Sequence, residues 1–356
     1  MNRTAAAVSF SRSRARLLLS VCLLALLAAG FVALADRDGP KTAPPDAVTA
    51  LPPILTPSQL YDHAQAAVVE VIIDDHLNGS GWIADPSGLV FTAAHVVDRD
   101  HKRIEVMTSK GERIEATLVA VDAGHDMAML RLAGRDAPYP ALPTAISLPQ
   151  PGEAIYLFGS PIYRHAIMIR GYVARRDMAF EYLSEQQTYI ETMYVAADTP
   201  RGTSGGAWLN ARGQVVGLQS GMMLDNSAQV GIAFVTPASA IHQLLQSKES
   251  ATTLSLGVAI EEMWEQPTDF LRKFPAKTEG IVIRTAHDGG PAAKAGLGES
   301  DVIVAVDGVP IRYRDQFMRL ILATPKGKDV VLRVIHSIAP DRPRSITVTP
   351  QRVEKK

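Results

Sequence analysis

Short apolar stretches separated by polar turns run through residues 67–237, and this pattern predicts β-strands. Many of the stretches are rich in valine, isoleucine and aromatic residues, which favour strands. We expect two sets of six strands. The first set is Ala67–Ile73, Gly79–Ala84, Leu89–Ala94, Arg103–Thr108, Arg113–Val121 and Met127–Leu132. The second set is Ala154–Gly159, Ile167–Arg176, Tyr189–Ala196, Gly206–Leu209, Val215–Gly221 and Val230–Val235.

A proline-rich joint, Ala137–Gly152, separates the two sets. Many short strands with few helical stretches are typical of a barrel or a sandwich. Helices are expected only at the two ends of this region, over Ser58–Ala67 and Pro237–Ser247. The polar residues 248–254 then form a linker.

Residues 255–350 mix strand and helix patterns and are numerous enough to fold alone. The expected strands are Gly280–Thr285, Val302–Val306, Asp329–Val334 and Ser345–Val348. The expected helices are Gly290–Ala295 and Tyr313–Ala323. The predicted fold class is therefore mainly β, with a smaller α+β unit at the C-terminal side.

The first 35 residues have the pattern of an export signal. Four arginines precede an apolar run, and Ala33-Leu34-Ala35 offers a cleavage site of the A-x-A type. Alternatively, residues 17–35 stay uncleaved and anchor the chain in a membrane, since this largely apolar stretch of 19 residues is about long enough for a span. Both interpretations place the rest of the chain outside the cytoplasm. Residues 36–59 then form a proline-rich linker.

The amino-acid composition limits the kinds of partner and site that the protein can have. Of 356 residues, 47% are hydrophobic and 21% charged, which is globular composition. The net charge of −1 and the lack of a basic stripe disfavour nucleic acid as a partner. Cys22, the one cysteine, lies in the export signal, so no disulfide or cysteine metal cluster is expected. The histidines show no ligand spacing, and we predict no metal and no cofactor.

The segment Gly202-Thr203-Ser204-Gly205-Gly206 is the sharpest chemical signal. A serine between glycines sits on a tight turn whose free N–H groups can stabilise an oxyanion. The same residues match the nucleophile elbow of α/β-hydrolases, but that fold requires a helix after the serine. Strand patterns follow here instead, at 215–221 and 230–235, which excludes that fold. By itself the segment is equally compatible with an ordinary turn.

Two further residues favour a catalytic serine over an ordinary turn. His95 lies at the end of an apolar strand and Asp126 opens another. Each alone fits a structural role. Together with Ser204 they supply a nucleophile, a base and an acid that orients the base. Their order along the chain, His–Asp–Ser, is the chymotrypsin order.

At this point the chain resembles the HtrA/Deg-type serine proteases, which are trypsin-like proteases followed by a PDZ module. Six segments carry the resemblance in the order of that family: Gly79–Ile83, Phe91–Val97, Asp126–Leu132, Phe158–Pro161, Gly202–Gly206 and Gly231–Pro237. The chain departs from the family just before the serine. Thr203 replaces the usual asparagine, and Asp198-Thr199-Pro200-Arg201 replaces residues common in the family.

The resemblance implies a chymotrypsin-like double β-barrel over residues 60–247. It implies that Ser204 is the nucleophile, His95 the base and Asp126 the orienting acid. The N–H groups of Gly202 and Ser204 would form the oxyanion hole.

The substrate pocket is less defined. Val216, Leu218 and Gly221 lie on the strand expected to line it. The family resemblance implies a preference for small or medium aliphatic residues before the cut. Asp198, however, stands six residues before Ser204, the spacing of the acid at the base of the trypsin pocket. A pocket with Asp198 would prefer Arg or Lys. The alternative for Asp198 is a surface turn before Pro200.

The C-terminal unit resembles a PDZ domain. Ser255–Val258 is similar to the loop that captures a terminal carboxylate, and Gly290–Leu297 is similar to a second PDZ motif. Leu256, Gly257 and Val258 would form the carboxylate loop, and the bound peptide would add a strand to the sheet edge. The alternative is an appendage that only packs on the protease.

We therefore predict an exported, ATP-independent serine endopeptidase that cleaves unfolded or damaged proteins. The resemblance implies a homotrimer in the bacterial periplasm or cell envelope, with C-terminal or unfolded peptide segments as partners. The alternatives are a processing or signalling protease with few substrates, and a chaperone or binding protein with little proteolysis. Among other residues, His125 is expected to be exposed, and Trp82, Trp208 and Trp264 to pack internally.

Overall fold

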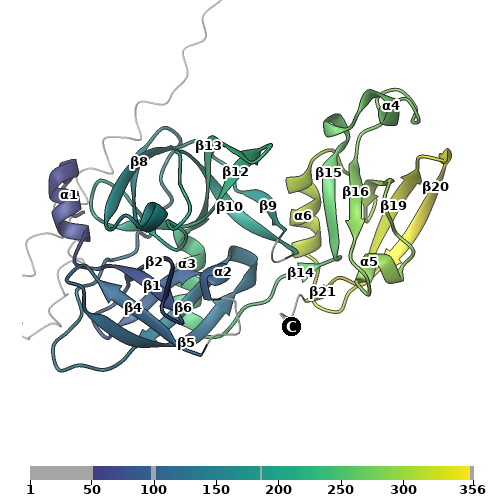
Figure 1. Cartoon of the computed structure of the whole chain (residues 1–356). Coiled ribbons are helices and arrows are strands. Elements are labelled where there is room, and N and C mark those ends of the chain that lie inside the picture. Colours follow the sequence, from purple (N-terminus) through teal and green to yellow (C-terminus); the bar gives the residue numbers. More distant parts are fainter. Residues whose placement is uncertain (1–50, 98–101, 185–186, 353–356) are drawn as a thin grey trace, which may run out of the picture. The chain divides into compact units, whose positions relative to one another are not determined.

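The structure, a computed structural model, describes residues 51–97, 102–184 and 187–352. The expected export signal and most of the linker 36–59 lie outside these residues. The unit from Pro52 onward is described below (Figure 1). None of the helices in the described part of the chain is long and apolar enough to span a membrane.

The first six strands form a closed antiparallel barrel in the order β1-β2-β3-β6-β5-β4. β1 pairs with both β2 and β4, which closes the ring. Trp82 stacks on Phe91 in its core, with ring centroids 5.4 Å apart. The strands are β1 (Val68–Ile73), β2 (His76–Ile83), β3 (Leu89–Ala93), β4 (Ile104–Thr108), β5 (Arg113–Asp122) and β6 (Met127–Leu132).

The next seven strands form a sheet in the order β13-β12-β11-β7-β8-β10-β9. An added pairing of β13 with β10 closes six of them into a second barrel and leaves β9 outside the ring. The predicted double β-barrel is thus confirmed, whereas β9 was not predicted. The strands are β7 (Ala154–Gly159), β8 (Ile167–Val173), β9 (Ala179–Leu183), β10 (Thr188–Ala196), β11 (Ala207–Leu209), β12 (Val215–Asp225) and β13 (Ala228–Pro237).

Short helices flank the barrels. α1 (Pro57–Ala64) begins with a capping box, in which Thr56 Oγ1 accepts from the N–H of Gln59 and Gln59 Oε1 accepts from the N–H of Thr56. Leu60 and Ala64 are buried in a hydrophobic cluster to which both barrels contribute, which fixes the helix against them. The remaining helices of this region are α2 (Ala94–Val97), η1 (Ala123–His125), η2 (Pro161–Tyr163) and α3 (Ala238–Ser247).

The segment after α3 is hydrogen-bonded to the first barrel. The N–H of Ala251 donates to the carbonyl of Val121, and the N–H of Val121 donates to Ser250 Oγ. A Cβ on Gly124 would lie 2.0 Å from Thr253 Oγ1, so a side chain at this position would clash. The predicted linker 248–254 therefore lies along the chain that leads to Asp126.

The C-terminal unit contains a five-stranded antiparallel path in the order β15-β16-β17-β19-β20. β18 (Val309–Pro310) pairs with β17, and β14 (Leu254–Ser255) pairs with β21 (Gln351–Arg352). The path consists of β15 (Val258–Glu262), β16 (Ile281–Ala286), β17 (Asp301–Val306), β19 (Val330–His336) and β20 (Ala339–Val348). The helices are η3 (Met263–Glu265), α4 (Thr268–Leu271), α5 (Pro291–Lys294) and α6 (Arg314–Leu322).

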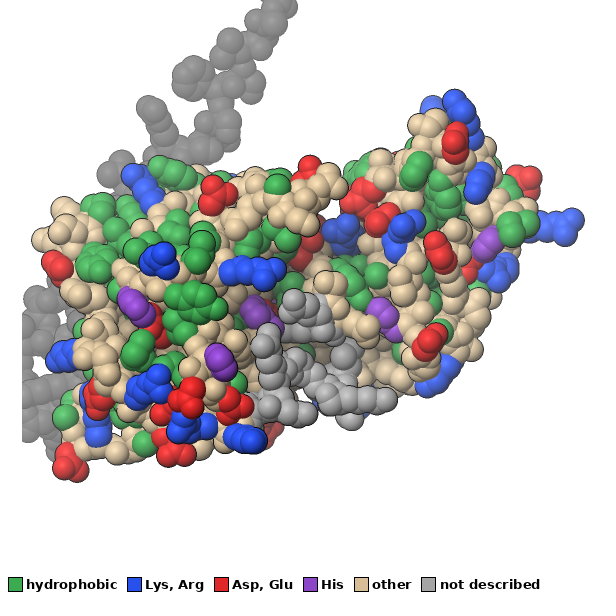
Figure 2. Space-filling model, in the orientation of Figure 1, with side chains coloured by type: hydrophobic (Ala, Val, Ile, Leu, Met, Phe, Trp, Pro, Cys, Tyr) green, Lys and Arg blue, Asp and Glu red, His purple; other side chains and the backbone are tan. Residues whose placement is uncertain are grey.

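Charges of both signs are interspersed over the face shown in Figure 2, with apolar side chains between them. On the first barrel, Arg103 and Arg113 both form ion pairs with Asp75 and Glu105. This mixing agrees with the small net charge of the sequence.

Candidate active site

Asp126 and His95 meet where two strands of the first barrel end. His95 is the second residue of α2, directly after β3, and Asp126 directly precedes β6. Asp126 Oδ2 lies 2.7 Å from His95 Nδ1, and Asp126 Oδ1 accepts from the backbone N–H of His95 at 3.0 Å. With a proton on Nδ1, the neutral imidazole carries its lone pair on Nε2. The pair therefore presents a base.

Ser220, on β12 of the second barrel, also donates its hydroxyl to Asp126 Oδ2. Asp126 is 0% exposed, and a buried carboxylate needs such donors to stay ionised. Ser220 was not predicted from the sequence. The available signal was a polar residue inside an apolar strand, but its partner lies 94 residues away.

The loop that carries Ser204 packs against β2 and against the end of β3, which His95 follows. The N–H of Ser80, on β2, donates to the carbonyl of Ser204 at 2.8 Å. Gly205 has a left-handed φ of 84°, and a Cβ there would lie 2.2 Å from the Ser80 carbonyl and 2.8 Å from the N of Ala93. Only glycine allows this approach. The backbone of the predicted nucleophile is thus next to β2 and β3.

Gly202 is held in a second glycine-dependent conformation. Its φ is 95°, and a Cβ there would lie 2.5 Å from the carbonyl oxygen of Ser160. The carbonyl of Arg201 accepts from the N–H of Ile162 at 2.8 Å. In a trans peptide the following N–H points the opposite way, so the Gly202 N–H faces away from Ile162. Within the described residues, the N–H groups of Gly202 and Ser204 donate to no acceptor.

The predicted pocket residues differ in their exposure to solvent. Val216 and Leu218 are buried in the hydrophobic cores of the barrels and offer no surface to a substrate, whereas Gly221 is partly exposed. Asp198 is exposed, and its Oδ1 lies 3.8 Å from the position of a Cβ on Gly231 of β13. It has no hydrogen-bond or ion-pair partner within the described ranges. An acidic group therefore lies beside β13 at the start of the Ser204 loop.

His125, expected to be exposed, is only 19% exposed at its side chain. Its Nδ1 contacts Asp122 at 2.8 Å, and its Nε2 contacts Glu191, on β10, at 3.4 Å. Burial lowers the pKa of His125, but the hydrogen bonds and charges of Asp122 and Glu191 outweigh this and raise the pKa to about 9. The imidazolium therefore links the two barrels next to Asp126.

The predicted carboxylate loop of the C-terminal unit is well anchored. Leu256 and Val258 are buried, and Gly257 has a left-handed φ of 70°. The carbonyls of Leu256 and Gly257 accept from Ala292 and His287, while the Gly257 N–H donates to Ser255 Oγ at 2.9 Å. The strand that follows, β15, is at the edge of the five-stranded path. Such an edge can accept an added strand.

Residues of β9 and β10 contact this edge. The Tyr189 hydroxyl accepts from the N–H of Ile260, on β15, at 2.8 Å. Phe180 is buried in the same hydrophobic cluster as residues of the C-terminal unit. Its N–H donates to Asp315 on α6, which also pairs with Arg175. Tyr189 therefore occupies a backbone donor that an added strand could otherwise use.

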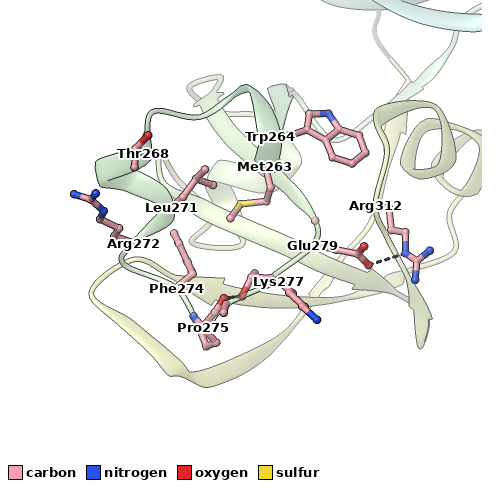
Figure 3. A pocket seen from close by; sticks show the side chains of 13 residues that line it. Met263, Trp264, Thr268, Leu271, Arg272, Phe274, Pro275, Lys277, Glu279 and Arg312 are labelled. Atoms are coloured by element: carbon pink, nitrogen blue, oxygen red, sulfur yellow. Dashed lines mark hydrogen bonds and ion pairs between the residues drawn. The ribbon is translucent and has the colours of Figure 1, made fainter.

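A cavity of about 510 Å³ lies elsewhere in the C-terminal unit (Figure 3). Its lining is mostly apolar, with Met263, Leu271 and Phe274, and an ion pair of Glu279 with Arg312. Trp264, which we expected to pack internally, is 60% exposed at its rim. No residue of the His95–Asp126 pair or the Ser204 loop lines this cavity, so it is not the site of the chemistry.

Comparison with protein families agrees with this organisation. Residues 79–218 match the trypsin-like peptidase domain, and residues 254–348 match the PDZ domain. The first match includes the predicted triad residues, and the second includes the predicted carboxylate loop.

Curated relatives have similar names. The chain is 28% identical over 275 residues to "Probable periplasmic serine endoprotease DegP-like" of Pseudomonas savastanoi, covering 76% of this chain and 55% of the relative. It is 29% identical over 267 residues to the protein of the same name in Chlamydia muridarum, covering 73% and 52%. The chain thus spans about half the length of these relatives.

Solved structures share the fold. The HtrA-type protease AlgW, solved with a decapeptide, has a TM-score of 0.60 at 20% identity and covers 85% of this chain and 100% of its own. The serine endoprotease from Yersinia pestis has a TM-score of 0.56 at 21% identity and covers 83% and 98%. The chain therefore joins a trypsin-like peptidase domain to a PDZ domain, and its fold is similar to that of the HtrA-type serine proteases.

Proposed function

We propose that the protein is a serine endopeptidase with the triad Ser204, His95 and Asp126. Ser204 Oγ attacks the peptide carbonyl while His95 Nε2 takes its proton. His95 then gives this proton to the leaving amine, and an acyl-enzyme remains on Ser204. Water, activated by His95, hydrolyses the ester and restores the serine. The observation that carries the proposal is the double contact of Asp126 with the ring and backbone of His95.

Asp126 fixes the histidine tautomer and stabilises the imidazolium that forms during the reaction. Its burial and its hydrogen bond from Ser220 support this role. The N–H groups of Gly202 and Ser204 stabilise the oxyanion. One such donor contributes about 10²–10³ in turnover in comparable enzymes.

The substrates that we propose are unfolded or damaged proteins outside the cytoplasm. The periplasmic names of the relatives support this location. Residues 17–35 would direct export or anchor the chain. The protease acts without ATP or a metal, and by resemblance as a homotrimer. A processing protease with few substrates remains the alternative within this class.

Cleavage after Arg or Lys is a second proposal, and it rests on Asp198. Its exposed carboxylate lies beside Gly231 and has no cationic partner within the described residues. The Arg or Lys side chain of a substrate could form an ion pair with this carboxylate. An aliphatic preference is the alternative, and Gly221 is the predicted pocket residue that keeps an open surface for it.

The PDZ unit binds peptide segments at the edge of β15, with Leu256, Gly257 and Val258 at the carboxylate end. The solved relative AlgW, which carries a decapeptide, supports this proposal. The contact of Tyr189 with Ile260 means that a peptide must displace β9–β10 residues to extend along the strand.

Casein cleavage by the purified protein tests the proposal, beside Ser204→Ala and Asp198→Asn, with product termini mapped by mass spectrometry. Ser204→Ala should lower turnover by roughly 10⁶. Equal cleavage by wild type and Ser204→Ala would overturn the assigned nucleophile. No cleavage by the wild type would favour the alternative that the protein is a chaperone or binding protein with little proteolysis. If the wild type cuts after Arg and Lys and Asp198→Asn does not, the acidic pocket is established. If both proteins cut only after aliphatic residues, the acidic pocket is excluded.

A further inference from the structure

Glu70 is a buried carboxylate that the proposed mechanism does not use. It lies in the middle of β1, where all six residues are buried, and it is 7% exposed. Its Oε2 is buried and has no hydrogen-bond partner among the described residues. Burying a carboxylate costs free energy unless hydrogen bonds or ion pairs compensate for the lost hydration.

Those other contacts all involve one loop of the second barrel. Glu70 Oε1 accepts from Ser160 Oγ at 2.5 Å and lies 2.6 Å from His165 Nδ1. Ser160 and His165 stand on either side of the turn η2 (Pro161–Tyr163). A single carboxylate oxygen on β1 therefore holds both ends of the segment 160–165.

The segment needs such a restraint. Ile162 has φ 48° and ψ 47°, and Tyr163 has φ 58°, so two bulky residues are in the left-handed region. For a β-branched residue this conformation is a rare outlier, which persists only where surrounding contacts impose it. The two contacts of Glu70 are suited to that task.

The same segment orients the predicted oxyanion hole. The N–H of Ile162 holds the carbonyl of Arg201, and the carbonyl of Ser160 lies against Gly202. In addition, Ser80 Oγ accepts from the N–H of Ser160 at 3.0 Å and donates to the carbonyl of Gly202 at 2.7 Å. Both peptide groups that flank Gly202 are thus tied to the segment that Glu70 restrains.

We propose that Glu70 is a positioning residue for the reaction. Through Ser160 and His165 it holds the strained turn, which in turn keeps the Gly202 N–H aimed at the oxyanion. The inference rests on the proposed serine endopeptidase function. Glu70 itself contacts neither substrate nor the triad in this arrangement. Its effect should therefore fall on kcat, since the oxyanion develops only in the transition state.

Glu105 offers a matched control. It lies on the neighbouring strand β4, and its Oε2 is also buried without a hydrogen bond between described residues. Its ion pairs are with Arg103 and Arg113 in the first barrel. A partly buried glutamate that supports only the barrel would affect stability but not the oxyanion loop.

The experiment compares wild type with Glu70→Leu, Glu70→Gln, Ser160→Ala and Glu105→Gln. The readouts are kcat and KM on one peptide substrate, and the melting temperature. Glu70→Leu and Ser160→Ala should each lower kcat about 10- to 100-fold with KM within about twofold, as partial loss of an oxyanion donor would. Glu70→Gln keeps an acceptor for Ser160 and should restore most of kcat. A double variant that combines Glu70→Leu with Ser160→Ala should be no slower than the slower of the two single variants, because both changes break the same contact.

Unchanged kcat in folded Glu70→Leu and Ser160→Ala would overturn the inference. So would a comparable loss in Glu105→Gln, because the effect would then follow barrel stability. If Glu70→Leu fails to fold, Ser160→Ala alone decides between these outcomes. An inactive wild type would instead overturn the proposed function, and the inference with it.

Discussion

At the scale of single residues, Asp126 shows how a buried charge is supported from two sides. His95 contributes a ring N–H and a backbone N–H from the first barrel, and Ser220 contributes a hydroxyl from the second. The carboxylate therefore depends on both barrels being in place, and its surroundings report on how they meet.

Ser220→Ala should lower kcat about 10- to 150-fold, because a hydrogen bond to a charged group contributes about 1.5–3 kcal/mol when the partner stays buried. Ser220→Thr keeps the hydroxyl and should stay near wild type. The measurement is steady-state kinetics on a peptide substrate. Equal activity of Ser220→Ala and wild type would show that the two donors of His95 suffice.

His125 should make stability depend on pH. Its pKa rises from 6.5 when unfolded to about 9 in the fold, so its contribution is complete below pH 6.5 and is lost as pH rises through 9. The melting temperature should fall by roughly 5 °C over this interval. His125→Gln should flatten the profile, measured by thermal unfolding at closely spaced pH values. An identical slope in both proteins would assign the pH dependence to other groups.

At the scale of elements, the sequence pattern predicted the barrel strands well because each half-buried or buried strand leaves a short apolar stretch. Met127–Leu132 and Ala154–Gly159 match β6 and β7 residue for residue. β9 was missed because Ala179–Leu183 lies outside the closed ring, and residues of the C-terminal unit bury Phe180. The edge strand β15 was missed as well, and only its first residue, Val258, was assigned, to the carboxylate loop.

Some residues of the candidate site could likewise be predicted from the sequence, and others could not. The glycine-flanked Ser204 and the chain order of the proposed triad were readable from local motifs. Ser220 and Glu70 were not, because their roles come from contacts 94 and 90 residues away along the chain. A polar residue in an apolar strand marks such a position, but it does not name the partner.

The capping box of α1 gives a prediction at this scale. Thr56→Ala removes the hydroxyl that accepts from Gln59 and should destabilise the protein by about 1 kcal/mol. Thr56→Ser keeps that oxygen and serves as the control. Thermal unfolding should show a drop of about 2–4 °C for the alanine variant alone. Identical drops in both variants would point to the lost methyl group instead.

At the scale of the whole molecule, the proposed peptide binding would compete with β9–β10 for the edge of β15. Tyr189→Phe removes the hydroxyl that occupies the Ile260 N–H and should raise peptide affinity about 2- to 10-fold, the value of one ordinary hydrogen bond. Tyr172→Phe is the control, since the Tyr172 hydroxyl makes no hydrogen bond within the described residues. Fluorescence anisotropy with a C-terminal peptide measures both. Equal affinities in all three proteins would mean that peptides bind without displacing Tyr189.

The hydrogen bonds of the segment 248–254 bear on how the protein can be divided into fragments. Ala251 and Ser250 pair with Val121, and Thr253 covers Gly124, two residues before Asp126. A truncated peptidase that stops at Ser247 would leave this stretch of backbone open to water. One that stops after Thr253 would keep it covered. The connection between the two domains therefore serves as the last element of the peptidase, and truncation at its start would disturb the acid of the proposed triad.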